Sequence, residues 1–412
     1  MPRITFRCPA SAFRNKCAEG RCPVRAEYGD DMNTAHYFDY AAATPLRQEL
    51  VELYPEYCRL YSANPHGTSV FNNLSRRAIV ESGEALLDFL DIPPAEAEVI
   101  WCSCATEALN LAILGWQPPT TRFSLIVDPT AHPAMLEPSL HRATCSPEAR
   151  LVKLAADKGG LLPQIPAGLQ DAKAAMLCLC HLNNETGILA PTVALSQAMR
   201  AACPATCLCL DASQCLGRVA LPWTSAQVTL LALSLRKAGG PQLGVLIRRR
   251  NCRLSPLWYG GGQQDGLRPG TLDAPSIALV KPLLNLLKQE QADNFHKLSA
   301  LNTALRQELS VAGQGRWEIL TPPTAPPSIL SVRLPGYDAG VFVRLLAQAH
   351  GFQISSGSAC AAESPAPSHV LTAMGYPPDF ARKVIRLCLS PAHTLEDIRN
   401  LVQAIRNTLD DY

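Results

Sequence analysis

Short apolar runs recur along the chain and alternate with longer stretches in which apolar residues are spaced as in an amphipathic helix. The runs have the length of buried strands, and the stretches between them predict helices, among them residues 107–114 and one that begins near His132. Repeated strand–helix alternation favours an α/β fold with a mostly parallel sheet covered on both faces. The expected strands are residues 36–40, 99–103, 123–127, 150–154, 175–179, 206–210, 228–233 and 243–247.

Two helical segments are expected before most of these strands. Residues 44–61 predict the first. The second begins near Asn73 or Ser75, which are candidate caps, and its apolar residues fall on one face up to Leu90.

A second, smaller domain is expected after the sheet. The long helical pattern over residues 276–311 links the two parts. We therefore predict a large domain over residues 32–290, whose segment 32–61 packs near the small domain, and a small α+β domain over 291–412. The expected small-domain elements are a strand at 329–332, a helix at 338–350, a short strand at 352–355 and a closing helix at 394–409.

The composition excludes several classes of function. The 412 residues carry a net charge of +2 with 17% charged residues, which gives no electrostatic basis for binding nucleic acid or a membrane surface. No apolar run approaches the roughly 20 residues that span a bilayer. Most of the 16 cysteines lie in strand-like runs, where thiols pack as small hydrophobes, and predict a reducing, cytoplasmic setting. Cys178, Cys180 and His181 make a poor zinc site, so no metal is predicted.

Residues 1–31 differ from the rest of the chain. They are basic and contain three cysteines, and no continuous apolar segment is present, which excludes a secretory signal. We therefore predict that residues 1–31 are a disordered basic extension, and two alternatives stay open: an organellar presequence and a translation start at Met32.

The candidate chemistry lies where predicted strands end. Lys237 follows an apolar run and precedes Gly-Gly-Pro, and Asp211 ends another run. Each alone is ordinarily a loop residue, but an amine and a carboxylate on neighbouring strand ends suit pyridoxal phosphate, PLP. Thr106 also follows a strand and opens a helix, where free backbone N–H groups bind phosphate. Ligands of such sheets bind at the carboxyl ends of the strands.

Three further features are candidates. His132 opens a helix after a strand, and either stacks on a ring or serves as an ordinary capping or core residue. The glycine-rich residues 260–271 suit a subunit contact. Cys360 lies in a loop of small residues, where it is either a mobile nucleophile or an incidental cysteine.

Together these segments resemble those of the cysteine desulfurases, which are fold-type I, class V aminotransferase-like PLP enzymes. The resemblance covers residues 36–409 in unbroken order, and the segment at 355–360 is specific for the NifS/IscS-like branch. The matching segments are 37–45 (YFDYAAATP), 105–107 (ATE), 181–187 (HLNNETG), 211–214 (DASQ), 231–241 (LALSLRKAGGP), 268–271 (RPGT) and 355–360 (SSGSAC).

The resemblance implies a role at each matching position. Lys237 would form the internal aldimine and carry the proton at the substrate α-carbon, and Asp211 would pair with the pyridinium nitrogen. Cys360 would take sulfur from L-cysteine as a persulfide and release L-alanine. His132 would stack on the ring and assist catalysis. The other implied positions are Gln214 at the ring 3′-oxygen, Ala105, Thr106, Ser234, Arg236 and the neighbouring subunit's Thr271 at the phosphate, Asn184 beside cofactor and substrate, and Asn64 and Arg386 at the substrate.

The implied partners are a second copy of the chain and a sulfur acceptor, either a scaffold or a sulfur carrier, for iron–sulfur cluster or thio-cofactor synthesis. Three positions depart from the family pattern. Arg236 replaces a histidine, Cys104 replaces a glycine, and Ser390-Pro391 replaces Gly-Arg after Arg386. Two other functions stay open: a selenocysteine lyase or related C–S lyase, and a weakly active homologue that serves as an assembly partner.

Overall fold

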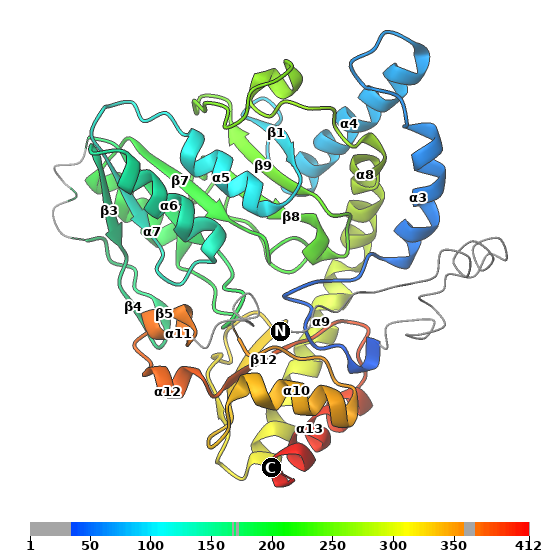
Figure 1. Ribbon diagram of the computed structural model, residues 1–412, viewed down its shortest axis with the longest axis vertical. Helices are drawn as coiled ribbons and strands as arrows, with labels where there is room; N and C mark the ends of the chain where they lie inside the picture. Colours follow the sequence, from blue (N-terminus) through cyan, green and yellow to red (C-terminus); the bar gives the residue numbers. More distant parts are fainter. Residues whose placement is uncertain (1–33, 167–168, 170–172, 358–366, 412) are drawn as a thin grey trace, which may run out of the picture.

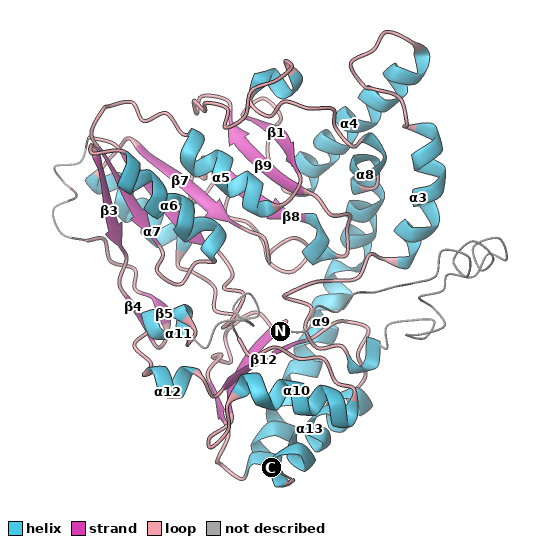
Figure 2. Ribbon diagram, in the orientation of Figure 1, coloured by secondary structure: helices cyan, strands magenta, loops and turns pink. Residues whose placement is uncertain are grey.

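The computed structural model describes residues 34–166, 169, 173–357 and 367–411 (Figure 1). The N-terminal extension and Cys360 therefore lie outside the described residues. Within them, a large α/β layer structure stands beside a smaller α+β unit, and α9 (Val280–Gly313) runs through both (Figure 2).

The large unit is built on a seven-stranded sheet of order β1-β9-β8-β7-β6-β2-β3. Strands β8, β7, β6, β2 and β3 pair in parallel, and β9 pairs antiparallel with both β8 and β1. The mostly parallel sheet predicted from the sequence is confirmed. The strands are β1 (Ala97–Cys102), β2 (Phe123–Val127), β3 (Ala149–Lys153), β6 (Ala175–Cys180), β7 (Thr206–Asp211), β8 (Leu230–Ser234) and β9 (Gly244–Arg249).

Continuous apolar runs make these strands because helices cover both faces of the sheet. Every residue of β6 and β7 is buried. Alternate residues contact two separate cores, one under α5 (Ala105–Gly115) and α6 (Pro133–Cys145), and the other under α7 (Thr192–Ala202) and the first half of α9. The cysteines of β6 and β7 lie in the first of these cores, where they pack as small apolar side chains.

The small unit is an antiparallel sheet covered by helices. The strands β10 (Glu318–Ile319), β11 (Ile329–Arg333) and β12 (Val384–Cys388) pair in this order. Helices α10 (Ala339–His350), α13 (Leu395–Asp410) and the second half of α9 pack with this sheet. Phe38, from the N-terminal segment, is fully buried in the same core. Helix α9 therefore contributes leucines to the core of each unit.

The remaining elements surround the two sheets. None of the described helices combines the length and apolarity needed to cross a bilayer. The remaining elements are the 3-10 helices η1 (Thr34–His36), η2 (Leu235–Ala238) and η3 (Gln263–Gly266), helices α3 (Gln48–Leu60), α4 (Val70–Phe89), α8 (Ala274–Ala278), α11 (His369–Ala373) and α12 (Pro378–Ala381), and the hairpin β4 (Ala156–Asp157) with β5 (Gly160–Leu161).

Most predicted elements are confirmed, with two corrections. The N-cap of α4 is Ser69, whose side chain accepts from the Asn72 amide, so neither Asn73 nor Ser75 is the cap. Residues 36–40 and 352–355 are not full strands. They form only isolated bridges, because each segment pairs with its neighbour at single positions, such as Tyr37 with Gln353.

Candidate active site

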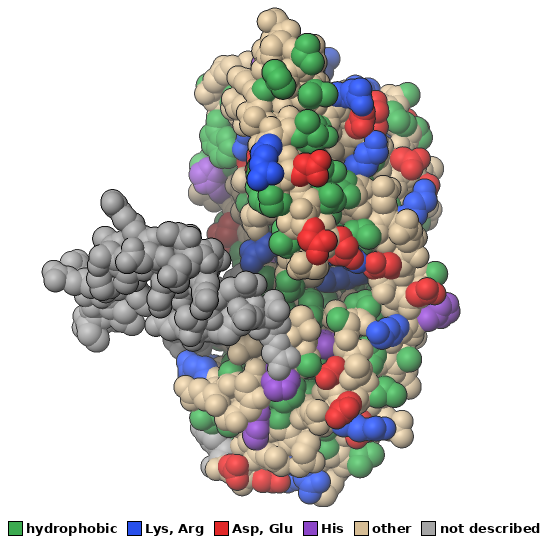
Figure 3. Space-filling model, turned by 90° about the vertical axis from the view of Figure 1, so that its right-hand side faces the viewer, with side chains coloured by type: hydrophobic (Ala, Val, Ile, Leu, Met, Phe, Trp, Pro, Cys, Tyr) green, Lys and Arg blue, Asp and Glu red, His purple; other side chains and the backbone are tan. Residues whose placement is uncertain are grey.

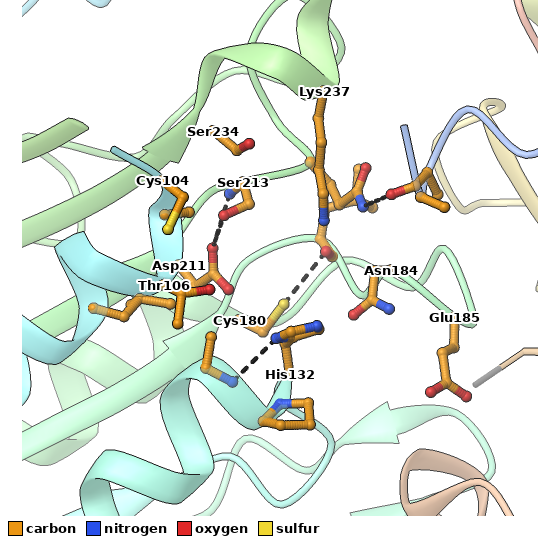
Figure 4. Close-up of a pocket in the computed structure, with 18 of the residues that line it drawn as sticks. Cys104, Thr106, His132, Cys180, Asn184, Glu185, Asp211, Ser213, Ser234 and Lys237 are labelled. Atoms are coloured by element: carbon orange, nitrogen blue, oxygen red, sulfur yellow. Dashed lines mark hydrogen bonds between the residues drawn. The ribbon is translucent and has the colours of Figure 1, made fainter. Parts of the chain in front are cut away.

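A cavity of about 520 Å³ lies at the carboxyl ends of β7 and β8 (Figure 4). Loops after β1, β2 and β6 form its walls, and the small unit adds Gly357, His369 and Arg386. Ligands of parallel α/β sheets bind at this position, outside the carboxyl ends of the strands. The cavity therefore joins residues that are far apart in the sequence.

Lys237 lies in η2, the turn that follows β8, and its side chain lines the cavity. Two donors fix its backbone: Thr44 Oγ1 and Arg218 Nη2 donate to the Lys237 carbonyl over 3.0 and 2.9 Å. Burial lowers the pKa of its amine, and the charge of Asp211 opposes that shift. A lowered pKa increases the neutral, nucleophilic fraction of the amine.

Asp211 is the last residue of β7 and is 5% exposed. Its Oδ1 accepts from the backbone amide of Ser213 over 2.9 Å and from the Ser213 hydroxyl over 2.5 Å. These bonds orient the carboxylate at the cavity wall. Because β7 and β8 pair in parallel, the carboxylate and the amine of Lys237 lie on neighbouring strand ends.

The turn from β1 to α5 forms an anion cradle. Cys104 is the N-cap of α5 and its side chain makes no capping bond, so it leaves the first-turn amides available. The cavity is lined here by Cys104, Ala105 and Thr106 on one side and by Ser234 and Arg236 on the other. Two hydroxyls, a guanidinium and helix N–H groups together suit a phosphate.

The backbone of this cradle rests directly against the sheet. A Cβ at Gly244 of β9 would overlap the Cys104 carbonyl and crowd the Ala105 amide nitrogen. The glycine is therefore required for the close approach of the turn to β9.

His132 is the N-cap of α6, and its Nδ1 accepts from the Ala134 amide over 3.0 Å. Burial lowers the pKa of the ring, with a further contribution from Lys237, while Asp211 acts in the opposite direction. The ring thus combines a capping role with a place in the cavity wall.

Arg386 of β12 is 2% exposed, and its side chain bonds two other groups of the site. Its Nη2 pairs with Asp39 Oδ1 over 2.6 Å, and its Nη1 donates to the Asn184 carbonyl over 2.9 Å. Its Nε has no partner among the described residues. Burial would lower the pKa of this guanidinium, but Cys388 and Asp39 raise it above the ordinary value.

Glu185 and Gln214 are also buried in the cavity wall. Ser368 Oγ donates to Glu185 Oε2 over 2.5 Å, and burial raises the pKa of Glu185. Gln214 donates to the Ala41 carbonyl over 2.9 Å and accepts from Arg218 over 2.7 Å. Both side chains are thus oriented by partners from distant segments.

The structure brings together most of the positions expected from the sequence. Two of them, Asn64 and Thr271, do not line the described cavity. Asn64 lies between α3 and α4, where its Oδ1 accepts from His66, and Thr271 is exposed. The residues that gather at the cavity are Lys237, Asp211, Gln214, His132, Ala105, Thr106, Ser234, Arg236, Asn184 and Arg386.

The sequence interpretation missed Asp39, Glu185, Arg218 and His369. Asp39 lies within the segment 37–45 and Glu185 within the segment 181–187. Both segments carry the family resemblance, but no role was predicted for either residue. Arg218 follows Gln214 by four residues in a turn, and His369 Nε2 contacts the Ala131 carbonyl at 2.9 Å. Only their long-range partners distinguish these residues, so the sequence offered no separate signal.

Comparison with known proteins agrees with this geometry. The model of the aminotransferase class-V family matches residues 36–401. A cysteine desulfurase of Frankia sp. (strain EuIK1) is 31% identical over 385 residues, which cover 90% of each chain. The chain belongs to the class-V aminotransferase family, among the cysteine desulfurases. The cysteine desulfurase NifS of Azotobacter vinelandii is 29% identical and covers 90% of this chain and 91% of the relative.

Solved structures of class-V relatives share the fold. A NifS-like protein superposes with a TM-score of 0.80 at 23% identity and covers 91% of this chain and 99% of the other. DndA from Streptomyces lividans gives a TM-score of 0.67 at 26% identity, with 85% and 98% covered.

The cysteine-desulfurase cavity has a donor set that fits PLP. An amine and a carboxylate lie on adjacent strand ends, and an uncapped helix N-terminus provides for a phosphate. The guanidinium of Arg386 has one nitrogen without a partner among the described residues, which suits a carboxylate.

Proposed function

We propose that this chain is a PLP-dependent cysteine desulfurase that converts L-cysteine to L-alanine and carries the sulfur as a persulfide on Cys360. Bound PLP supplies an electron sink for negative charge at the substrate α-carbon. The observation that carries the proposal is the placement of Lys237 and Asp211 at one cavity, opposite the α5 N-terminus. The family membership supports the same conclusion.

Each group of the large unit has a separate task in this proposal. Lys237 holds the cofactor through its amine and moves a proton at the substrate α-carbon. Asp211 would keep the pyridine nitrogen of bound PLP protonated, and Gln214 would contact the ring 3′-oxygen. His132 would hold the ring from the cavity wall. The phosphate is held by the amides of Ala105 and Thr106, the hydroxyls of Thr106 and Ser234, Arg236, and Thr271 of the partner subunit.

Substrate is oriented from the small unit. Arg386 pairs with the cysteine carboxylate, and Asn184 lies beside it. Asn64 is proposed as a further substrate contact. Asp39 and the Asn184 carbonyl hold the guanidinium in place and so reduce the ordering required on binding.

The sulfur step is balanced within the enzyme and its substrate. The thiolate of Cys360 attacks the substrate sulfur, and an S–S bond forms as the C–S bond breaks. The carbon retains the electron pair of the broken bond and is protonated, so alanine leaves and a persulfide remains. An acceptor, either a scaffold or a sulfur carrier for iron–sulfur or thio-cofactor synthesis, then removes the sulfur.

We further propose that the protein forms a homodimer and acts in the cytoplasm. The described cysteines are free thiols, including exposed ones such as Cys58 and Cys145, which supports a reducing compartment.

One pair of variants tests the proposal. The parent should show a visible absorption band of bound cofactor and should release equal amounts of alanine and sulfide from cysteine in the presence of a thiol. Lys237→Ala should abolish the band and turnover. Cys360→Ser should keep the band and lose alanine release. A parent that is inactive on cysteine but active on selenocysteine would identify a selenocysteine lyase, and a parent without the band would leave only a non-catalytic role.

A further inference from the structure

A second, larger cavity lies between the two units. It measures about 910 Å³ and is formed by the middle of α9, the proline-rich residues 323–328 and residues 217–220. Its far wall is fixed, because Asn302 Nδ2 donates to the Pro327 carbonyl over 2.9 Å. Cavities of this size at domain boundaries are typical small-molecule sites.

The lining of this interdomain cavity is basic and partly apolar. Lys288, His296 and Arg218 contribute to it, and none of the described residues that line it is acidic, although Lys288 Nζ also lies 3.8 Å from Oδ2 of Asp88, which is outside the lining. The Phe295 ring is 50% exposed beside them.

Arg218 connects this cavity with the active site. Its Nη1 donates to Gln214 Oε1 over 2.7 Å and its Nη2 to the Lys237 carbonyl over 2.9 Å. It also lines the interdomain cavity. All its recorded acceptors in the described structure are neutral, so this deep cation has no carboxylate partner there. A buried charge of this kind favours an anionic ligand.

We propose that the interdomain cavity binds a small organic anion with a flat apolar body, and that Arg218 links this site to Lys237. The anionic group of the ligand faces Arg218 and Lys288, and its apolar body lies against Phe295 and the prolines. The binding part of the proposal is independent of the proposed function, whereas the link to Lys237 rests on it.

The link follows from electrostatics. The positive charge of Arg218 contributes to lowering the pKa of Lys237. An anion beside Arg218 partly cancels that field and draws the guanidinium away from the Lys237 carbonyl. The nitrogen of Lys237 should then hold its proton to higher pH. Reciprocity requires that a change at Lys237 also alters the affinity for the anion.

Binding is tested by titration calorimetry with 2-naphthoate, using neutral 2-naphthamide for comparison. We expect a dissociation constant below about 1 mM for the acid and at least about tenfold weaker binding of the amide. Lys288→Gln should raise the dissociation constant of the acid several-fold. Lys297→Gln, on the same helix but outside the lining, should not. Equal binding of acid and amide, or equal effects of the two lysine variants, would overturn the site.

A filling variant separates this site from the active-site cavity. Ala292 lines the interdomain cavity and is absent from the described lining of the active-site cavity, so Ala292→Trp should abolish naphthoate binding while the visible cofactor band persists. Retained naphthoate binding in Ala292→Trp would place the ligand elsewhere and refute the proposal.

The link is tested by pH titration of the visible band of the holoenzyme. Saturating 2-naphthoate should raise the apparent pKa by at least about 0.3 in the parent, and Arg218→Gln should lose this shift. Binding without any shift in the parent would refute the link through Arg218. If the parent has no visible band, the proposed function fails, while calorimetry on the same protein still decides the anion site.

Discussion

Lys237 is a base placed where its charge is disfavoured, and its removal should have a defined effect on the cofactor-free protein. Burial lowers its pKa below the ordinary value of 10.5. Between the lowered pKa and that value the unfolded chain binds more protons, so stability rises with pH in this interval. At pH values below the lowered pKa, Lys237 is charged in both states, and the full cost of burying that charge lowers the free energy of unfolding. Lys237→Met should therefore stabilise the cofactor-free chain most at low pH, and less as pH approaches 10.

Urea unfolding of the cofactor-free protein at several pH values measures this difference. Lys297→Met, at an exposed lysine of α9, is the matched control, and its difference from the parent should stay constant. A Lys237→Met difference that did not shrink with rising pH would show that the amine is not the source of the effect.

Asp211 is expected to control the rate rather than the affinity for the cofactor. Asp211→Asn keeps the size and the contact with Ser213 but removes the charge that holds the pyridine nitrogen protonated. Turnover should fall by about 10³ or more, because a preorganised charge partner is lost. Alanine release measures the rate and the visible band measures retention of the cofactor. Near-parent activity would mean that another acid protonates the ring.

The sequence led to Lys237, Asp211, Thr106 and His132 for one physical reason. Each follows an apolar run, and parallel strands bring their carboxyl ends to one edge. Asp39, Glu185 and Arg218 obey no such rule. Their positions depend on contacts such as Arg386 with Asp39 across 347 residues, which local patterns do not encode.

At the scale of elements, the contact between β9 and the α5 turn should govern phosphate binding. Gly244→Ala places a methyl group against the Cys104 carbonyl and the Ala105 amide, so the cradle must move. Overpacking of this kind costs about 1–3 kcal/mol, which corresponds to roughly 5- to 150-fold weaker cofactor binding if the whole cost falls on the bound state. Gly83→Ala in α4 is the control, because a Cβ there makes only ordinary contacts with Val99 and Trp101, at 3.7 Å or more. Cofactor titration of the two variants should separate them; equal affinities would show that the turn is not positioned by β9.

The start of α4 gives a second test at this scale. Ser69 and Asn72 form a reciprocal capping box, so Ser69→Ala should lower the free energy of unfolding by about 1 kcal/mol. Asn73 lies inside the helix and bonds only Arg76 among the described residues, so Asn73→Ala should have a much smaller effect. Chemical denaturation of both variants checks the assignment, and a larger loss for Asn73→Ala would contradict it.

These elements also show where sequence patterns fail. Ser69, Asn73 and Ser75 are all good capping residues within two turns, and only the bond geometry selects one. Residues 36–40 alternate like a strand because Phe38 fills the core of the small unit, but their neighbours allow only single bridges. These residues have the sequence pattern of a strand but do not pair along their length with a neighbouring strand, because burial of their side chains determines the path of the backbone.

At the scale of the molecule, several exposed apolar side chains support the proposed homodimer. Val70, Phe71 and Tyr259 are 72%, 68% and 90% exposed, and Tyr259 adjoins the glycine-rich residues 260–271. Figure 3 views the face on which α3 lies and shows apolar side chains scattered between charged ones. Within the protomer, Gln264 and Arg268 tie this loop to Trp101 and Glu107, which leaves Thr271 exposed. The loop is thus anchored at its base, and its threonine is free to reach a second subunit.

A mixed dimer tests whether Thr271 serves the partner's site. A dimer of Lys237→Ala subunits is expected to be inactive. A dimer of Thr271→Ala subunits should bind the cofactor about tenfold more weakly, or weaker still, because a hydrogen bond to the phosphate is lost. Dimers with one subunit of each variant, purified through two different tags, should regain one site of parental affinity. At that site the Thr271→Ala subunit supplies Lys237 and the Lys237→Ala subunit supplies Thr271. If Thr271 acted within its own subunit, the only site with Lys237 would keep the defect and no parental site would appear. Sedimentation of the parent as a fully active monomer would exclude the arrangement altogether.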